Sequence, residues 1–313
     1  MGAALALAER GRGRTGANPS VGCILVRDGR VVGRGWTQPG GRPHAEAMAL
    51  GEAVAAAAGA IAYVTLEPCA HESERGPACA ELLVAAKVAG VVVAHPDPDP
   101  RTDGRGVARL RAAGIHVEQG VRREEAARTL AGFLTRLRHR RPHVTLKLAL
   151  SLDGALAMGD GASQWITGAE ARGHAHLERS RHEHILVGRG TVEADLPRLD
   201  VRLPGLEART PEPVILTSGP PPLPGVRTLA RPEDIAALPG NHLLVEGGAG
   251  AAAAFLAAGL VDRLLLYRAP IIVGGGLTLP EIGLERLADA HGRWRSVDAR
   301  RLGVDRLEVY ERA

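Results

Sequence analysis

Pro43-His44-Ala45-Glu46, together with Pro68-Cys69 and Cys79 further along, is the stretch of sequence that decides the fold of the first half of the chain. One imidazole and two thiolates supply three zinc ligands and leave a fourth position open, as catalytic zinc sites do. Glu46 is a spare carboxylate that can carry protons during attack on an amino-bearing ring carbon. The pattern predicts zinc held by His44, Cys69 and Cys79, with Glu46 as the catalytic residue of a hydrolytic deamination.

Local secondary structure is expected to bring these residues together. His44 and Glu46 converge only within the first turn of a helix, and Pro43 suits a helix start. The Ala-rich run 45–58 predicts that helix, Ile61–Leu66 predicts a buried strand leading into Pro68-Cys69, and residues 79–89 predict a second helix. Nine residues separate the two cysteines, so we expect a loop that borders the site.

Composition bounds the class of protein. A chain of 313 residues suggests two domains at about 150 residues each. Three cysteines, two of them assigned to zinc, exclude a disulfide scaffold and indicate a reducing compartment, and Cys23 is interpreted as core. We find no signal-peptide pattern and no apolar run long enough for a transmembrane helix, so a cytoplasmic protein without a membrane partner is expected.

The charge of the chain gives little support to nucleic-acid binding. The pI is near 9.3, but the formal net charge is only +4. Aromatic residues, which provide stacking platforms for single strands, make up 3% of the chain. We therefore expect no nucleic-acid partner. The one dense basic run is interpreted as a solvated helix end, where cations are favourable; it comprises Arg136, Arg138, Arg140 and Arg141.

The first half alternates strands and helices, which predicts an α/β/α layered sheet. Strands are expected at 21–26, 31–35, 61–66, 91–94 and 115–117, and further helices at 107–113 and 123–139. Arg140-Arg141-Pro142 then marks a boundary, because proline stops the helix and a new strand, His143–Leu150, starts at once. The predicted domains are residues 1–140 and 141–313.

The second half alternates in the same way. Further strands are expected at 185–187, 214–217, 242–245, 263–267 and 305–310, with a helix at 170–181. Val245-Glu246-Gly247-Gly248-Ala249-Gly250 stands at a strand end and opens a helix at 251–258, where free N–H groups attract phosphate. The segment does not match the GxGxxG pattern, so a Rossmann domain is not predicted.

These residues carry a resemblance over nearly the full length of the chain. The chain resembles the bifunctional riboflavin-biosynthesis deaminase/reductase family. The first half matches it through Asn18-Pro19, Val21-Gly22-Cys23, Pro43-His44-Ala45-Glu46, Thr65-Leu66-Glu67-Pro68-Cys69 and Gly104-Arg105-Gly106. The second half matches it through Leu146-Lys147, Ser151-Leu152-Asp153-Gly154, Ser163-Gln164-Trp165-Ile166-Thr167, Thr191, Ala194-Asp195, Val245-Glu246-Gly247-Gly248 and Ala269-Pro270.

The resemblance implies a fold and two activities. It implies a cytidine-deaminase-like α/β/α domain that binds Zn²⁺, followed by a dihydrofolate-reductase-like α/β domain that uses NADPH. The first would deaminate a diaminopyrimidinone ribosyl phosphate, and the second would reduce the ribosyl chain of the product to ribityl. The partners would be small phosphorylated pyrimidines, and a homo-oligomer is expected.

The resemblance also implies roles for individual residues. Asn18 and Arg75 would face the deaminase substrate. In the reductase, Ser163, Arg179, Leu199, Arg202 and Glu246 would bind substrate, with both arginines suited to phosphate. The NADPH positions would be Ala149, Trp165, Thr191, Asp195, Ser218 and the stretch 248–254, which begins with Gly248, Ala249 and Gly250. Asp195 would in addition be catalytic, by helping to protonate the opened sugar.

The chain departs from the family pattern at a few places. Asp99 stands in Asp97-Pro98-Asp99-Pro100 where an asparagine is common, so a carboxylate replaces an amide that can donate. Leu196 follows Asp195 where a second polar residue is common, and the reductase half is short between Arg202 and Leu243. Two other interpretations remain. One is a zinc deaminase active on another aminated pyrimidine or on nucleic acid, whose second domain is an appended binding domain or an inactive or ligand-sensing reductase-like domain. The other is a non-catalytic zinc protein whose second domain senses a nucleotide.

Overall fold

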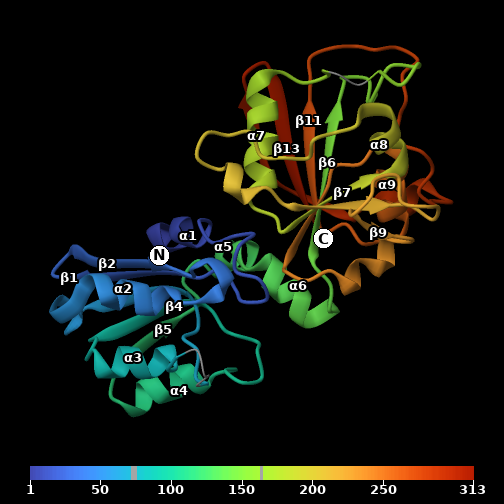
Figure 1. The fold of residues 1–313 in the computed structure, drawn as a ribbon. Helices are drawn as coiled ribbons and strands as arrows, with labels where there is room; N and C mark the ends of the chain where they lie inside the picture. The colour runs from blue at the N-terminus through green and yellow to red at the C-terminus, as the bar shows by residue number, and fades with distance from the viewer. Residues whose placement is uncertain (72–75, 163–164) are drawn as a thin grey trace. The chain divides into compact units, whose positions relative to one another are not determined.

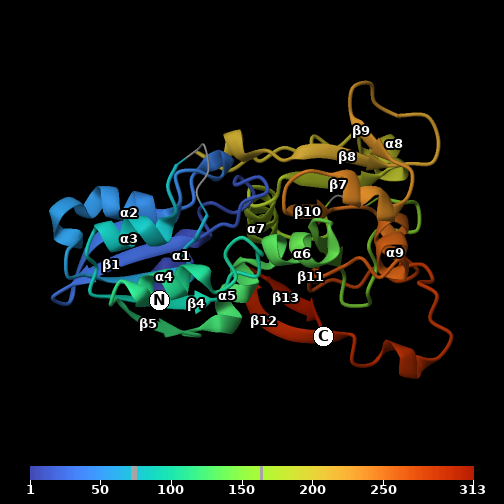
Figure 2. The ribbon, with the colours of Figure 1, turned by 90° about the horizontal axis from the view of Figure 1, so that it is seen from below.

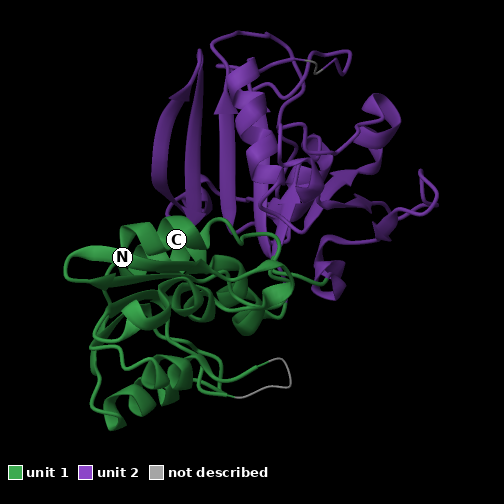
Figure 3. Ribbon diagram, turned by 60° about the vertical axis from the view of Figure 1, so that its left-hand side comes forward, with its two compact units in different colours: residues 1–140, 239–241 green, residues 141–238, 242–313 purple. Residues whose placement is uncertain are grey.

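The computed structural model describes residues 1–71, 76–162 and 165–313, which form two compact units. Unit 1 comprises residues 1–140 and 239–241, and unit 2 comprises residues 141–238 and 242–313 (Figure 3). Within the described residues, no helix combines the length and the apolar character needed to cross a membrane.

Unit 1 is built on a five-stranded sheet with the strand order β2-β1-β3-β4-β5 (Figure 1). Strands β1 and β2 form an antiparallel hairpin, and β1 also pairs antiparallel with β3. Strands β3, β4 and β5 are parallel to one another. The strands are β1 (Gly22–Arg27), β2 (Arg30–Trp36), β3 (Ile61–Leu66), β4 (Gly90–His95) and β5 (His116–Gln119).

Helices cover both faces of this sheet, as the view from below also shows (Figure 2). One layer contains α2 (Ala45–Ala53), α3 (Cys79–Ala85) and α4 (Arg105–Ala112). The other contains α1 (Gly2–Ala8) and α5 (Arg123–Thr129), which α6 (Ala131–His139) follows. The predicted α/β/α layering of the first half is therefore confirmed.

Small residues let α2 approach the sheet closely. Ala45, Ala49 and Ala53 are buried at helical spacing on the face of α2 that meets the sheet. Opposite them, a Cβ atom on Gly35 of β2 would lie 2.0 Å from the Ala45 carbonyl oxygen, so only glycine fits. This contact fixes the start of α2, which carries the histidine and the glutamate of the predicted zinc site.

Unit 2 is built on an eight-stranded sheet with the strand order β12-β13-β11-β6-β10-β7-β8-β9. The six strands from β11 to β9 in this order are parallel to their neighbours, and β13 and β12 add an antiparallel edge. They are β6 (His143–Leu150), β7 (His184–Gly188), β8 (Glu212–Leu216), β9 (Arg227–Leu229), β10 (His242–Val245), β11 (Arg263–Arg268), β12 (Trp294–Leu302) and β13 (Asp305–Arg312).

Alternate side chains of the central strands bury against helices on opposite faces of the sheet. Leu265 and Tyr267 of β11 pack with Ala171 of α7 (Ala169–Arg179). Leu264 of the same strand packs in another cluster with Phe255 of α9 (Ala249–Ala257). A third helix, α8 (Arg189–Asp195), follows β7 directly.

The structure corrects several predicted elements. The helix predicted at 123–139 is interrupted at Leu130, which has φ −88° and ψ 0°. Pro43 lies one residue before the N-cap of α2 rather than in its first turn. Of the basic run, Arg141 is not a solvated side chain, since both of its terminal nitrogens bond to Asp262 at 2.6 and 2.8 Å.

Candidate functional site

The predicted zinc ligands lie together at the starts of two helices. His44 is the N-cap of α2, Cys79 is the first residue of α3, and Cys69 lies in the loop after β3. Their ligand atoms all lie within 4.8 Å of one another. The chain therefore brings together three residues that are far apart in sequence around one point.

The spacing of these atoms suits zinc. Nδ1 of His44 is 3.3 Å from Sγ of Cys79 and 3.6 Å from Sγ of Cys69. With the usual zinc–nitrogen and zinc–sulfur bond lengths, a tetrahedral site separates such ligands by about 3.6 Å. Two soft thiolates and one imidazole also form a donor set that zinc prefers. The three side chains therefore fit the ion.

The thiols already differ in acidity. The hydrogen bond from the Cys79 thiol lowers the pKa of Cys69, and the Cys79 backbone N–H also bonds to this sulfur at 3.2 Å. The same pairing, together with burial, raises the pKa of Cys79. The pair therefore presents one thiolate at neutral pH, which is the form that binds a metal.

Glu46 lies in the first turn of α2, two residues after His44, and only 3% of its surface is exposed. Burial and the nearby charge of Cys69 raise the pKa of Glu46 to about 7. A carboxyl group that titrates near neutrality can both take up and release a proton. The role of Glu46 as the proton carrier stays a prediction.

A second buried glutamate holds the loop that carries Cys69. Glu67 accepts hydrogen bonds from the backbone N–H groups of Val107 and Gly104 at 3.1 and 3.2 Å, at the start of α4. A Cβ atom on Gly106 would lie 2.0 Å from the Pro68 carbonyl oxygen. The close packing of α4 on this loop therefore fixes the position of Cys69.

A cavity of about 200 Å³ opens beside these residues. Asn18, predicted to face the deaminase substrate, lines it together with His44, Glu46 and Cys69. Arg75, the other predicted substrate residue, lies outside the described residues. Several further lining residues have no role predicted from the sequence, among them Arg42, His71, Asp97, Arg101 and Phe133, and Asp99 also lines the cavity.

Asp99, one of the departures from the family pattern, has a partner close by. Arg101 donates to its two carboxylate oxygens, with Nη2 2.6 Å from Oδ2. These hydrogen bonds hold the pKa of Asp99 below its usual range. The carboxylate is thus kept charged at the wall of the cavity, and the Asp-Pro-Asp-Pro run directly after β4 was the sequence signal for it.

Unit 2 holds a larger cavity of about 650 Å³ near the carboxyl ends of β6, β7 and β10. Such strand ends are the usual ligand sites of open α/β sheets. The structure brings nine of the residues predicted for the reductase into its lining: Ala149, Trp165, Arg179, Thr191, Asp195, Leu199, Arg202, Glu246 and Gly248. Lys147 and His176 also line it, and the sequence analysis gave them no role in the site.

The other predicted reductase residues lie elsewhere. Ala249 and Gly250 occupy the first turn of α9, and Ser218 is exposed in the loop after β8; none of the three lines the cavity. Ser163 lies outside the described residues. Trp165 is 64% exposed and the guanidinium of Arg172 lies 4.9 Å from its ring centroid, so the indole is not part of the core.

A buried ion pair forms one wall of this cavity. Nε and Nη2 of Arg179 donate to the two carboxylate oxygens of Glu246 at 2.8 and 2.9 Å. Lys147 Nζ lies 3.9 Å from Oε2 of the same carboxylate. Burial alone would raise the pKa of Glu246, but the bonds and charge of Arg179 outweigh it and the pKa is lowered. Glu246 is therefore ionised at neutral pH.

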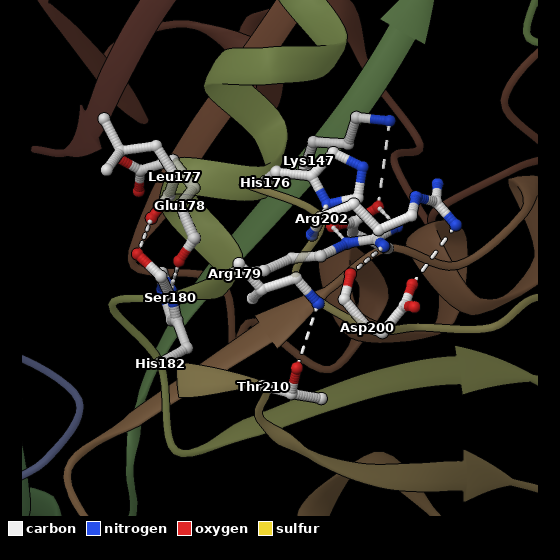
Figure 4. Close-up of polar contacts among 12 residues, drawn as sticks. Lys147, His176, Leu177, Glu178, Arg179, Ser180, His182, Asp200, Arg202 and Thr210 are labelled. Atoms are coloured by element: carbon white, nitrogen blue, oxygen red, sulfur yellow. Dashed lines mark hydrogen bonds and ion pairs between the residues drawn. The ribbon is translucent and has the colours of Figure 1, made fainter. Parts of the chain in front are cut away.

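Arg202 is placed near Arg179 through Asp200 (Figure 4). The backbone carbonyl oxygen of Asp200 accepts a hydrogen bond from Arg179 at 2.9 Å. Oδ1 of the Asp200 side chain accepts a hydrogen bond from Arg202 at 3.1 Å. The backbone N–H of Arg202 donates to Nδ1 of His176 at 3.3 Å. The cavity thus has a cationic wall suited to an anionic ligand, with Glu246 as the acceptor within it.

Comparison with known families defines the class of protein. Residues 1–95 match the cytidine and deoxycytidylate deaminase zinc-binding region. Residues 142–224 and 232–306 match the RibD C-terminal domain. The fold and site therefore define a deaminase-type zinc domain joined to a RibD-type α/β domain.

Individual relatives extend this match over the whole chain. The riboflavin biosynthesis protein RibD of Escherichia coli is 41% identical, with 97% of this chain and 96% of the relative covered. RibD of Aquifex aeolicus is 36% identical, with 100% and 97% covered. The chain belongs to the RibD family of riboflavin biosynthesis proteins, so the predicted resemblance is confirmed.

Solved structures agree. One form of Acinetobacter baumannii RibD has a TM-score of 0.86 at 37% identity, covering 100% of this chain and 98% of that one. A Thermotoga maritima diaminohydroxyphosphoribosylaminopyrimidine deaminase/5-amino-6-(5-phosphoribosylamino)uracil reductase has a TM-score of 0.88 at 29% identity, covering 100% and 97%. The predicted fold class is confirmed as a cytidine-deaminase-like α/β/α domain followed by a second α/β domain, which is the RibD C-terminal domain.

Proposed function

We propose that the chain is a bifunctional enzyme of riboflavin biosynthesis, with a zinc-dependent deaminase in residues 1–140 and an NADPH-dependent reductase in residues 141–313. The observation that carries the proposal is that one chain holds two cavities, each lined by side chains suited to one of the two reactions. One contains His44 and Cys69 with Glu46 beside them, and the other contains the Arg179–Glu246 pair. Family membership over the full length supports assigning both activities to it.

In the deaminase, His44, Cys69 and Cys79 would hold the zinc ion. When bound, zinc would supply an activated water by lowering its pKa toward neutrality. Glu46, buried next to the ligands, would take up a proton and deliver it to the departing ammonia. Asn18, at the cavity wall, would hydrogen-bond the pyrimidine and orient it.

In the reductase, the cavity wall would bind a ribosyl phosphate and orient its sugar. Arg179 and Arg202 would contact the phosphate, and Glu246 would bind the substrate beside them. NADPH would supply a hydride, and its binding positions would include Thr191, Trp165 and Gly248 at the N-terminus of α9. Asp195, at the end of α8, would help to protonate the opened sugar.

Two interpretations from the sequence are not favoured. A nucleic-acid deaminase with an appended binding domain and a non-catalytic zinc protein both lack a reason for a RibD C-terminal domain in the second half. Small phosphorylated pyrimidines are the partners that we propose for both cavities. The cytoplasmic location and the homo-oligomeric state stay predictions.

The test is a coupled assay on the purified, zinc-loaded protein. The diaminopyrimidinone ribosyl phosphate is supplied with NADPH, and ammonia release and NADPH oxidation are followed together. Equal amounts of both products support the bifunctional assignment. Ammonia without NADPH oxidation would refute the reductase assignment. If neither signal appears, the deaminase assignment is refuted, and NADPH oxidation with the deaminated product supplied directly then tests the reductase.

The variant Glu46→Gln separates the two activities. It is expected to release no ammonia from the diaminopyrimidinone and yet to oxidise NADPH when the deaminated product is supplied directly. A Glu46→Gln protein that still deaminates would show that another group carries the proton.

A further inference from the structure

A short segment from the second half of the sequence belongs to unit 1. Residues 239–241 lie between the turn Pro232–Ala237 and β10, yet they group with residues 1–140 (Figure 3). Arg136 of α6 donates a hydrogen bond to the carbonyl oxygen of Gly240. Gly240 has φ +77°, a conformation that other residues rarely adopt. The segment is therefore shaped and held for a specific position in unit 1.

Asn241 is the buried residue of this segment, whereas Pro239 is exposed and Gly240 is partly exposed. The surface of Asn241 is 2% exposed, and its Nδ2 donates to the carbonyl oxygens of Gly16 and Asn18 at 2.8 and 3.0 Å. Because both acceptors are carbonyl oxygens, the amide nitrogen and not the amide oxygen must face them. Asn241 and Asn18 are the two asparagines of the chain.

The backbone that Asn241 holds is a wall of the deaminase cavity. Ala17, Asn18 and Pro19 line this cavity. Asn241 bonds on either side of Ala17, and the hydroxyl of Thr15 adds a bond to the Asn18 carbonyl oxygen at 2.7 Å. Two donors thus fix the backbone of Asn18, and Asn241 alone of the two reaches both Gly16 and Asn18.

The side chain of Asn18 is fixed by packing. A Cβ atom on Gly41 would lie 2.1 Å from Nδ2 of Asn18, so the amide lies directly over this glycine. Rotation of the backbone at residues 16–18 would move the amide off Gly41. The direction in which Asn18 points therefore depends on the hydrogen bonds from Asn241.

We propose that Asn241 is a positioning residue for the deaminase: it holds residues 16–18 so that the Asn18 amide faces the pyrimidine substrate. This proposal rests on the deaminase function proposed for unit 1. Asn241 does not contact the substrate itself and acts through Asn18. A residue that the sequence places in the reductase half thus sets substrate binding in the deaminase.

The test compares Asn241→Ala and Asn241→Asp in the full-length protein. The alanine variant removes both donors, and the aspartate variant keeps the shape but turns a carboxylate toward two carbonyl oxygens. Both are expected to raise the KM for ammonia release, roughly tenfold for alanine and further for aspartate. We expect kcat, bound zinc and NADPH oxidation with the deaminated product to stay close to wild type.

Two further variants complete the design. Glu233→Gln changes an exposed residue of the preceding turn and should leave the KM unchanged. Asn241→Ser keeps one donor, so its KM should lie between those of wild type and Asn241→Ala. This variant also tests the proposal if the alanine variant does not fold.

Three results would overturn the proposal. One is an unchanged KM in the alanine and aspartate variants. Another is a parallel loss of ammonia release, zinc and NADPH oxidation, which indicates a folding role. If the wild-type protein releases no ammonia, the deaminase function fails and the role of Asn241 fails with it, whereas an active wild type with unaffected variants refutes the role of Asn241 alone.

Discussion

Replacing Arg179 by methionine would leave a buried carboxylate without its main partner. Arg179 and Glu246 have side chains that are 14% and 7% exposed, and two hydrogen bonds of 2.8 and 2.9 Å join them. Lys147 is a second cation close to this carboxylate, with Nζ 3.9 Å from Oε2 of Glu246. The substitution keeps the length of the aliphatic stem, so the perturbation is mainly electrostatic.

Breaking a buried pair from one side costs about 3–5 kcal/mol, because the other charge stays desolvated. Partial compensation by Lys147 places Arg179→Met near the lower end of this range. The double variant Arg179→Met/Glu246→Gln should recover most of the loss, because the amide carries no charge to leave unpaired. The matched control is Arg189→Met, which breaks an exposed pair with Glu193 (side chains 40% and 54% exposed) and an exposed hydrogen bond to the Pro220 carbonyl oxygen. It should cost only about 1 kcal/mol.

The assay is urea denaturation of each variant followed by circular dichroism at several pH values. Since the pKa of Glu246 is lowered from its ordinary value of 4.5, the pair stabilises the folded state above that pH. This stabilisation is lost as the pH falls through the lower folded value. The difference between wild type and Arg179→Met should therefore shrink in acid.

Two results would refute this account of the pair. One is a cost for Arg179→Met at pH 7 no greater than that of Arg189→Met. The other is a double variant whose loss is the sum of the two single losses, since additive costs would mean that the residues do not interact.

Three further predictions concern the metal, the packing and the acid stability. Removing zinc with a chelator should abolish ammonia release and leave NADPH oxidation with the deaminated product intact, measured on the same sample before and after zinc is restored. Gly106→Ala should weaken zinc binding in a chelator competition, because its Cβ would meet the Pro68 carbonyl oxygen, whereas Gly51→Ala in α2, where a Cβ meets nothing within 4 Å, should not. Asp262 has a pKa lowered from 3.8, since its bonds to Arg141 and to the Val144 N–H outweigh the effect of burial. Asp262→Asn should lower the urea midpoint of unfolding at pH 7. The difference in midpoint between the variant and wild type should become smaller as the pH falls below 3.8.

Elements with strong local signals were predictable from the sequence. Strands β3, β6 and β10 have the predicted bounds, because short apolar runs ended by proline, glycine or charged residues define them. The zinc ligands were predictable for a related reason, since their residue types and order carry the chemistry. Buried Cys23 likewise follows from the apolar run around it.

Elements and partners that depend on distant residues were not predictable. Strand β12 was missed because it is an edge strand, largely exposed and rich in arginine, and its pairing with β13 alone makes it a strand. The sequence predicts that Arg141 is part of a solvated basic run, because its partner Asp262 lies more than a hundred residues further along the chain. Lys147 reads as a charge in a strand until β10 brings Glu246 within reach.

Both cavities follow from the same feature of their sheets. In unit 1, the loops after the parallel strands β3 and β4 bring Cys69 and Asp97 to the cavity. In unit 2, Glu246 directly follows the parallel strand β10 and lines the other cavity. Parallel strands end at one edge, where helices begin and their partial positive charge favours anions and thiolates. This common edge explains why both cavities lie at the carboxyl ends of parallel strands. What distinguishes the two sites is the side chains presented there: thiols that suit a metal in one, and an arginine-rich wall that suits a phosphate in the other.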